Sequence, residues 1–438
     1  MDDMKIEASP TKEFFINMLV RDIPLVRAIL DLIDNAVDSA KRIRPNNDFT
    51  GLKVSIQLED DRFSIRDNCG GMTLQIAKEY AFRFGRPKKA ELTARSIGRF
   101  GVGMKRTIFK LGNYFEISSK TISCSFSIQQ DVQEWVKNEE WEFHFSDIKK
   151  EENNIEKTGT KIVVTKLHKS ISEELKLEHF RTTLINEIET AYPLILKSGL
   201  AITLNKVPVN IRPLEMLTSG KIVPAFFQKT YSVNGHDITV TIYAGLAERS
   251  KSESGWYIFC NGRMVLEHDQ TFITGWGEGN GKTIPKYHTN FAFFRGYVFF
   301  DSDDAEALPW TTTKTGLDTD LPLYKSIRLE MIKQMRPIVK FLSDLAKEKS
   351  EKESGDRDEA PLEIAIQKTT ATWFDKETIP TPFIAPKSEQ YSIKPLTGRI
   401  QYNATREKIK KVKLSLGVTT NTDVGRMTFD YYYENECE

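Results

Sequence analysis

The sequence predicts an α+β chain. One observation is a long amphipathic helix at residues 25–40, in which apolar side chains recur at spacings of three and four. A second is the pair of alternating segments that follows at residues 53–58 and 62–65, which indicates a strand hairpin. A third is the later succession of short strand-like segments before one long helical pattern at residues 323–349. The length of 438 residues fits two or three domains.

Charge and cysteine content narrow the class of protein. The chain has 62 Lys and Arg against 61 Asp and Glu, so no global basic excess predicts capture of nucleic acid, and only local patches remain for that role. The cysteines are scattered without a C-x-x-C pair, which favours a reducing compartment over a disulfide framework or a zinc site. The N-terminus does not resemble a signal sequence, and no apolar run approaches the ~20 residues that span a bilayer. We therefore expect a cytoplasmic protein without a membrane partner.

The helix at residues 25–40 combines its apolar stripe with a group of acidic and amide side chains. Asp31 and Asn35 are four residues apart and stack on one helix face, with Asp34 and Asp38 in the same turns. A carboxylate and a carboxamide placed in this way can hold a water and a Mg²⁺ ion above a nucleotide. The alternative is a helix with a solvated acidic face.

The segment IRDNCGGM, residues 65–72, places Asp67 at a strand end before a glycine turn. A carboxylate there can accept a hydrogen bond from an exocyclic amine such as the adenine N6. Gly70 and Gly71 allow positive φ and let a flat ring approach the backbone. The alternative is an ordinary Asp-Asn-Gly turn.

The segment SIGRFGVGMK, residues 96–105, is rich in glycine. Its glycines leave backbone N–H groups uncovered, and a helix predicted at residues 107–112 adds partial positive charge, so the loop can bind phosphate. Lys105 adds a full charge. The spacing is not that of a Walker loop, and no apolar strand precedes it as in a βαβ dinucleotide unit. Further on, residues 157–167 read as a turn containing Thr160 that leads into a buried strand.

In this order and spacing, the four segments together resemble the GHKL ATPase family, which contains DNA gyrase B subunits, heat-shock chaperone ATPases, histidine kinases and MutL. The resemblance covers residues 10–167 and is greatest to MORC-like and uncharacterised bacterial members with an appended C-terminal region. It implies the Bergerat fold, an ATP-binding α/β sandwich with helices on one face of a mixed, mainly antiparallel sheet. It also implies ATP and Mg²⁺ as ligands.

The family's motifs assign roles to single residues of this chain. By resemblance, Asp31 would activate water, Asn35 would bind Mg²⁺, and Asp67 would bind the adenine amine. Thr160 would support Asp67 and its water. The other implied nucleotide contacts are two residues beside the base and the phosphate-binding end of the ATP lid: Gly71, Met72, Gly98, Arg99, Phe100, Gly101, Val102, Gly103, Met104 and Lys105.

Two positions depart from the family pattern. The usual base is Glu, whereas Asp31 is one methylene shorter, and a general base must come within hydrogen-bond distance of its water. We therefore expect slow turnover. The usual adenine motif is Asp-x-Gly-x-Gly, whereas Cys69 stands at the first Gly position, and Gly70 is expected to take over the turn by a shift of one residue.

The remaining chain is expected to form a lid, a second domain and a C-terminal region. Residues 72–97 lie between two nucleotide motifs and are basic, so we expect a mobile ATP lid whose closure excludes water. Lys314 resembles, in position and in its small polar flanks, the basic residue that the family's transducer domain sends to the γ-phosphate; the alternative is a surface lysine. The expected domains are an ATP-binding domain with an N-terminal strap at 1–175, a transducer-like α/β domain at 176–349, a charged linker at 350–362, and a C-terminal region at 363–438 with helices at its end.

The expected function is Mg²⁺-dependent ATP hydrolysis that closes the lid and makes an ATP-dependent homodimer. Such a dimer would act as a conformational switch or clamp, on nucleic acid or in defence against foreign DNA. A basic face on the C-terminal helix pattern, formed by Lys408, Lys410, Lys411 and Lys413, favours nucleic acid. One alternative is a chaperone-like ATPase that remodels a protein client. Another is a non-hydrolysing ATP-sensing module, for which the short side chain of Asp31 is the clue.

Overall fold

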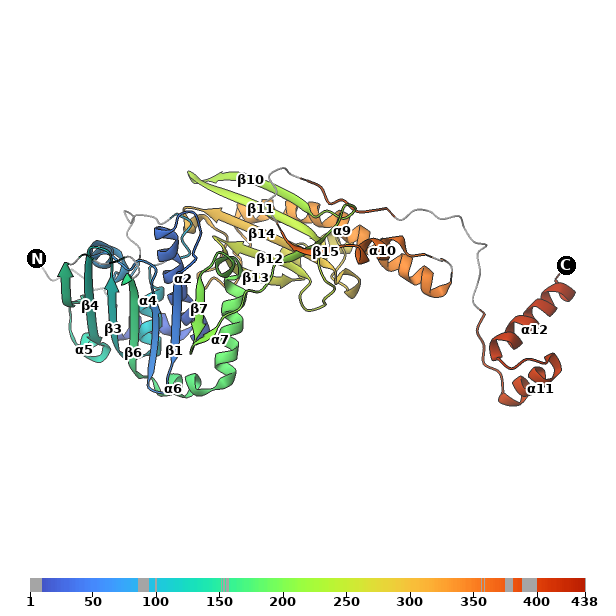
Figure 1. Cartoon of the computed structure of the whole chain (residues 1–438), viewed down its shortest axis with the longest axis horizontal. Helices are drawn as coiled ribbons and strands as arrows, with labels where there is room; N and C mark the ends of the chain where they lie inside the picture. The colour runs from blue at the N-terminus through green and yellow to red at the C-terminus, as the bar shows by residue number, and fades with distance from the viewer. Residues whose placement is uncertain are drawn as a thin grey trace, which may run out of the picture. The chain divides into compact units, whose positions relative to one another are not determined.

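The computed structural model describes residues 10–85, 94–98, 101–150, 152, 154, 157–355, 357, 359–374, 381–387 and 400–437. The chain divides into two compact units. The first combines residues up to 349 with residues 360–388, and the second combines residues 350–359 with residues 389–438. Both large sheets belong to the first unit (Figure 1).

The first sheet has eight strands in the order β5-β4-β3-β6-β2-β1-β7-β8. Neighbouring strands are antiparallel except β1 and β7, which run parallel. Buried and exposed residues alternate along β1, as expected for a sheet with one covered face. The strands are β1 (Lys53–Leu58), β2 (Arg62–Asp67), β3 (Gly112–Lys120), β4 (Cys124–Asp131), β5 (Phe145–Lys150), β6 (Gly159–Leu167), β7 (Ala201–Leu204) and β8 (Val207–Pro208).

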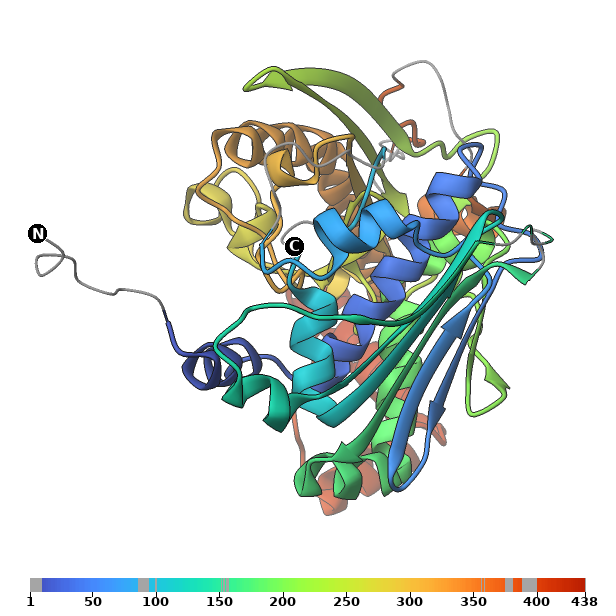
Figure 2. The same ribbon diagram turned by 90° about the vertical axis from the view of Figure 1, so that its left-hand side faces the viewer.

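Helices cover one face of this sheet (Figure 2). The apolar stripe of α2, which includes Ile29, Ile33 and Val37, is fully buried in the core, and α2 packs against α4. On the other side of α2, Asp31, Asp34 and Asp38 are buried as well, whereas Asn35 between them is exposed. The helices of this part are α1 (Lys12–Arg21), α2 (Leu25–Ile43), α3 (Leu74–Ile76), the π-helical turn η1 (Ala77–Ala81), α4 (Gly103–Leu111), α5 (Val132–Lys137), α6 (Lys169–Lys176), α7 (Glu178–Ala191) and α8 (Pro193–Lys197).

The second sheet has five strands in the order β10-β11-β14-β12-β13, antiparallel except for the pair β12 and β14. On one face, Trp256 donates to the Met335 sulfur of the long helix α9. On the other, aromatic side chains such as Tyr257 and Phe299 form a second core with Phe374, which follows β15. The elements are β9 (Glu215–Thr218), β10 (Ala225–Val233), β11 (His236–Leu246), β12 (Gly255–Cys260), β13 (Arg263–Asp269), β14 (Phe294–Ser302), α9 (Pro322–Ser354), α10 (Pro361–Gln367) and β15 (Thr370–Trp373).

The second unit contains helices α11 (Arg406–Leu416) and α12 (Asn421–Glu436), which pack against each other. Gly417 follows α11 in the left-handed conformation that commonly ends a helix. Phe429 and the tyrosines at 431–433 are exposed on α12, and the lysines of α11 are largely exposed too. Among the described residues, no helix is both long and apolar enough to cross a lipid bilayer.

The predicted fold class is confirmed, with three local corrections. The spacing of apolar residues over 179–199 predicts one helix, but the structure divides it into α7 and α8 at Tyr192, because the residue before a proline avoids the helical region. The charged segment expected to be a linker from residue 350 stays helical as far as Ser354. The first sheet continues beyond residue 175, since β7 pairs with β1 and β8 pairs with β7. The domain boundaries themselves stay predictions.

Candidate functional site

A cavity of about 590 Å³ opens beside α2 in the first unit. Its wall is built from α2, the end of β2, the start of β6, the glycine-rich loop and the segment around Lys314. The predicted site residues that line it are Asp31, Asn35, Asp67, Met72, Gly98, Gly101, Val102, Gly103, Met104, Lys105, Thr160 and Lys314. Residues as far apart in sequence as Asp31 and Lys314, which are 283 positions apart, therefore meet at one hollow.

Asp31 lies in the cavity wall between two cations. Arg106 of α4 donates to its Oδ2 at 2.5 Å, and the Lys314 ammonium donates to its Oδ1 at 3.3 Å. Gly103 passes so close that a Cβ there would lie 3.1 Å from Asp31 Oδ2. Because both oxygens of Asp31 contact cations, its side chain is held in a defined orientation.

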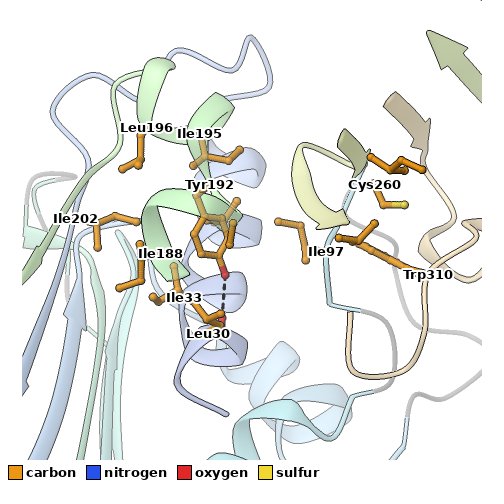
Figure 3. Close-up of a cluster of buried hydrophobic side chains, with 14 of the residues drawn as sticks. Leu30, Ile33, Ile97, Ile188, Tyr192, Ile195, Leu196, Ile202, Cys260 and Trp310 are labelled. Atoms are coloured by element: carbon orange, nitrogen blue, oxygen red, sulfur yellow. Dashed lines mark hydrogen bonds between the residues drawn. The ribbon is translucent and has the colours of Figure 1, made fainter. Parts of the chain in front are cut away.

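Asp34, one helical turn from Asp31, is fully buried in a second group of charges. Lys314 donates to its Oδ2 at 2.6 Å, Tyr192 donates to its Oδ1 at 2.6 Å, and Arg263 of β13 donates to Oδ2 as well. Burial by itself raises the pKa of Asp34, but the charges of Arg263 and Lys314 outweigh it and hold that pKa below its usual value. Figure 3 shows Tyr192 directed at α2, where its hydroxyl also bonds to the Leu30 carbonyl at 3.0 Å.

Asp67, the last residue of β2, also lines the cavity. Its carboxyl lies deep in the protein with part of its surface facing the cavity, and its Oδ1 accepts from the amides of Cys69 at 2.8 Å and Thr160 at 3.3 Å. Burial raises the pKa of Asp67 to about 6, although these two hydrogen bonds lower it. Met72 reaches the cavity, and its amide donates to the Ser119 hydroxyl at 2.7 Å.

Gly70 and Gly71 adopt positive φ values of 89° and 71°. A Cβ at Gly71 would lie 2.4 Å from the Lys120 carbonyl oxygen, so Gly71 packs against the sheet backbone instead of lining the cavity. The expected shift of the turn to Gly70 agrees with this conformation, and Cys69 is buried in the core. Its thiol does not face the cavity wall.

The end of the lid is bound to α2 instead of being open to a ligand. The amides of Ile97 and Gly98 both donate to the Asp38 carboxylate at 2.7 Å. The prediction that the Gly98 N–H is uncovered for phosphate is therefore wrong in this conformation, because Asp38 occupies it. Gly101 has a φ of 63° and lines the cavity, as does Gly103 at the start of α4. Arg99 and Phe100 lie outside the described residues.

Lys105 lies in the first turn of α4 with its side chain almost fully buried. Its ammonium donates to the Ala81 carbonyl at 2.7 Å and sits 5.7 Å from the ring centre of Phe84. Burial lowers the pKa of Lys105 to about 7. A nearby anion would raise that pKa again, so this lysine is suited to respond to a phosphate group.

A family model described as "Histidine kinase-, DNA gyrase B-, and HSP90-like ATPase" matches residues 23–161. These residues form α2, the glycine-rich loop and most of the first sheet, and they contain the cavity wall from Asp31 to Thr160. Residues 23–161 are a GHKL ATPase domain. The resemblance inferred from the sequence motifs is thus confirmed for this part of the chain.

One curated relative matches more of the chain than the GHKL domain. It is a Herpetosiphon aurantiacus protein named "Putative type II restriction enzyme HgiDII", 24% identical over 355 residues. The match covers 74% of this chain and 54% of the relative, so the chain spans about half the length of that protein. The similarity therefore extends beyond the ATPase domain but leaves much of the relative unmatched.

The residues of the GHKL domain fit a Mg²⁺-nucleotide. The cavity volume lies in the range of about 300–1,000 Å³ that is usual for small-molecule sites. Unlike the three buried aspartates of α2, Asn35 is exposed, and its carboxamide is open to the cavity. Among the described residues, no cluster of three or more His, Cys, Asp or Glu could hold a metal ion. Mg²⁺ prefers few protein ligands together with phosphate oxygens and water, which one carboxamide here would supply.

Several residues of the GHKL site carried no sequence signal that singled them out. Asp34 and Asp38 lie in the predicted helix, but their burial appears only when the second domain and the lid end cover α2. Arg106 directly follows the predicted phosphate loop, and a basic residue at that position is a signal for a charged contact near the phosphates. Arg263 directly follows the Asn-Gly pair at residues 261 and 262. It is 229 positions from Asp34, and nothing in its local pattern indicates contact with α2.

Proposed function

We propose that this chain is a Mg²⁺-dependent ATP hydrolase whose closure on ATP makes a homodimer that acts as a switch or clamp. The observation that carries the proposal is the cavity of the GHKL domain, where Asp31 and Asn35 face the same hollow as Asp67 and Lys314. A purine at Asp67 and a terminal phosphate near Lys314 would place the reacting phosphoryl group beside Asp31.

Each residue then has a separate task. Asp67 accepts a hydrogen bond from the adenine amine, and Asn35 holds the Mg²⁺ ion together with triphosphate oxygens. The metal neutralises charge on the phosphates. Asp31 orients or deprotonates the attacking water, and the Lys314 ammonium stabilises charge that develops on the γ-phosphate. Since only ATP offers that phosphate, Lys314 also distinguishes ATP from ADP.

The test of this proposal uses Asp31→Asn and Asn35→Ala. Asp31→Asn removes the base but keeps a hydrogen-bond acceptor for Arg106, so turnover should fall by about 10²–10⁴-fold with little change in ATP affinity. Asn35→Ala should remove the Mg²⁺ dependence of ATP binding in calorimetry. Unchanged turnover in Asp31→Asn would exclude Asp31 as the base, and Mg²⁺-dependent binding that survives in Asn35→Ala would exclude its metal role.

A second candidate is an ATP-sensing module that does not hydrolyse ATP. It is favoured by the pairing of Asp31 with both Arg106 and Lys314, which leaves neither carboxylate oxygen without a cation. The two candidates differ in one measurement. A purified chain that binds ATP and closes but releases no phosphate over many hours supports the sensing module.

For the biological role, we propose action on nucleic acid, in defence against foreign DNA. Support comes from the relative named as a type II restriction enzyme and from the lysines exposed on α11. A chaperone-like ATPase is the competing role. ATPase stimulation by an unfolded protein, together with no salt-dependent binding of duplex DNA, would favour the chaperone and contradict the DNA role.

A further inference from the structure

Lys314 is shared between two carboxylates of α2. Its ammonium lies 3.3 Å from Asp31 Oδ1 and 2.6 Å from Asp34 Oδ2. The residue has a left-handed φ of 56° in the turn between Trp310 and Leu317, whose backbones form an isolated β-bridge. In this conformation Lys314 is therefore bound to protein, and it must leave at least one carboxylate to bind a phosphate.

Each carboxylate also has a cation of its own. Asp31 is paired with Arg106 of α4, and Asp34 is paired with Arg263 of β13. Two carboxylates thus face three cations, and Lys314 is the only one of the three that contacts both. If Lys314 moves away, neither aspartate is left as an unpaired buried charge, which would be strongly unfavourable.

The side chain of Arg263 is held in place by burial and hydrogen bonds. Its side chain is 1% exposed, and its Nη1 also donates to the Tyr192 hydroxyl at 3.2 Å. It follows the turn formed by Asn261 and Gly262, whose φ values are 49° and 81°. The Asn261 carboxamide accepts from the Ser302 amide of its own sheet and donates to the Ser96 carbonyl, and the Asn261 backbone carbonyl accepts from Lys41 of α2. The hairpin turn is therefore bound both to its own sheet and to the GHKL domain.

We propose that Arg263 is a positioning residue that frees Lys314 to bind the γ-phosphate, by serving as the standing counter-ion of Asp34. The inference rests on the proposed function, because it assumes that Lys314 binds the γ-phosphate of ATP. Without Arg263, Lys314 would be the only cation of the described residues that contacts Asp34, and it would stay there. The second domain thereby sets how strongly the ATPase domain distinguishes ATP from ADP.

The variant Arg263→Met tests this by removing the charge and keeping an unbranched chain. The quantity measured is the ratio of the affinities for a non-hydrolysable ATP analogue and for ADP, both with Mg²⁺. We expect this ratio to fall by about tenfold or more, within the range of ordinary coupling between sites, while ADP affinity stays unchanged. A merely structural role would weaken both ligands together.

Arg295→Met is the matched control. Arg295 is a second buried arginine of the same sheet, 8% exposed, and its Nη1 donates to the Tyr257 hydroxyl at 2.9 Å. It belongs to the aromatic face of the sheet and does not line the cavity. The ratio should therefore stay at the wild-type value in Arg295→Met, and an equal fall in both variants would overturn the inference.

Asp34→Asn keeps the inference testable if Arg263→Met does not fold. A neutral carboxamide in place of the Asp34 carboxylate needs no counter-ion, so Asp34→Asn/Arg263→Met should recover the wild-type ratio, and Asp34→Asn alone should equal or exceed it. A low ratio in either variant, or a wild-type ratio in a folded Arg263→Met, overturns the inference while nucleotide binding stands. Failure of the wild-type chain to bind either nucleotide would instead overturn the proposed function and this inference with it.

Discussion

Asp34 and Asp38, two buried aspartates of α2, show how the kind of partner decides the state of a carboxyl group. Burial is the largest influence on both pKa values and raises each of them. For Asp34 the charges of Arg263 and Lys314 outweigh the effect of burial, and the pKa lies below its usual value. For Asp38 the partners are Lys41 and two backbone amides, which do not offset burial, and the pKa stays raised. Two cations in contact with Asp34 therefore outweigh its burial, whereas one lysine and two amides do not outweigh burial and the nearby charge of Asp34 at Asp38.

At the residue scale we predict that ATP binding takes up protons at pH 8. With its pKa lowered to about 7 by burial, Lys105 is mostly neutral at that pH, and bound phosphate would raise the pKa and protonate it. Asp67, with a pKa of about 6, is already ionised at pH 8 and adds no proton. Calorimetry in two buffers of different ionisation enthalpy measures the number of protons, which should approach one.

Lys110→Met is the control for this measurement. Lys110 lies on the same helix as Lys105, but its ammonium donates to the Val20 carbonyl at 3.1 Å and does not line the cavity. Proton uptake should disappear in Lys105→Met and persist in Lys110→Met. Equal uptake in all three proteins would show that another group takes the proton.

At the scale of elements, the β12–β13 hairpin of the second sheet contacts the ATPase domain through Asn261 and Arg263. An Asn-Gly pair is typical of a hairpin turn, so the turn itself can be inferred locally, but its position against Ser96 is a result of packing. Ile97 lies in one core with Cys260 and Trp310, as Figure 3 shows. The hairpin therefore contacts α2 and the lid end at the same time.

The variant Asn261→Gly tests the importance of this turn without changing its backbone. Glycine keeps the left-handed conformation, so only the carboxamide bonds to Ser96 and Ser302 are lost. Because both partners are buried, we expect destabilisation of about 1–3 kcal/mol, measured as a lower midpoint of urea unfolding followed by tryptophan fluorescence.

Asn234→Gly is the matched control for the hairpin variant. Asn234 and Gly235 form the turn between β10 and β11 with φ values of 52° and 83°, but both residues are exposed. The expected change there is within about 0.5 kcal/mol. If both variants unfold at the same midpoint, the contacts of Asn261 do not stabilise the protein.

At the scale of the whole molecule, the prediction concerns assembly. The cavity lies in the first unit, and Lys314 in its wall is the residue that we propose to distinguish ATP from ADP. We predict that sedimentation velocity finds a dimer with a non-hydrolysable ATP analogue and a monomer with ADP or without nucleotide. The physical reason is that a ligand shifts an equilibrium only by its differential contacts with the two states.

Duplex DNA in the same sedimentation experiment tests the clamp. If the nucleic-acid role is right, DNA co-sediments with the analogue-bound form, and binding weakens as salt increases. A monomer under every condition would contradict the predicted ATP-dependent dimer. A dimer that does not bind DNA at low salt would contradict only the DNA role. The exposed lysines of α11 are the first positions to neutralise if DNA does bind.

Local spacing was enough to predict the α2 helix, the β1–β2 hairpin and the motifs of the ATPase domain. These depend on residues a few positions apart, which face the same side of a helix or strand. The positions of Asp31, Asn35, Asp67 and Lys314 around one cavity agree with that prediction, while their chemical roles stay predictions.

Contacts between distant segments could not be predicted in the same way. Nothing near Arg263 in the sequence indicates that it contacts Asp34, and nothing near Gly98 indicates that its amide donates a hydrogen bond to Asp38. A buried charge is satisfied by whichever partner the folded chain brings within reach, and that depends on how two domains pack. The sequence motifs and their resemblance to the GHKL family therefore predicted which residues form the site, whereas the network of charges around Lys314 was decided by tertiary structure.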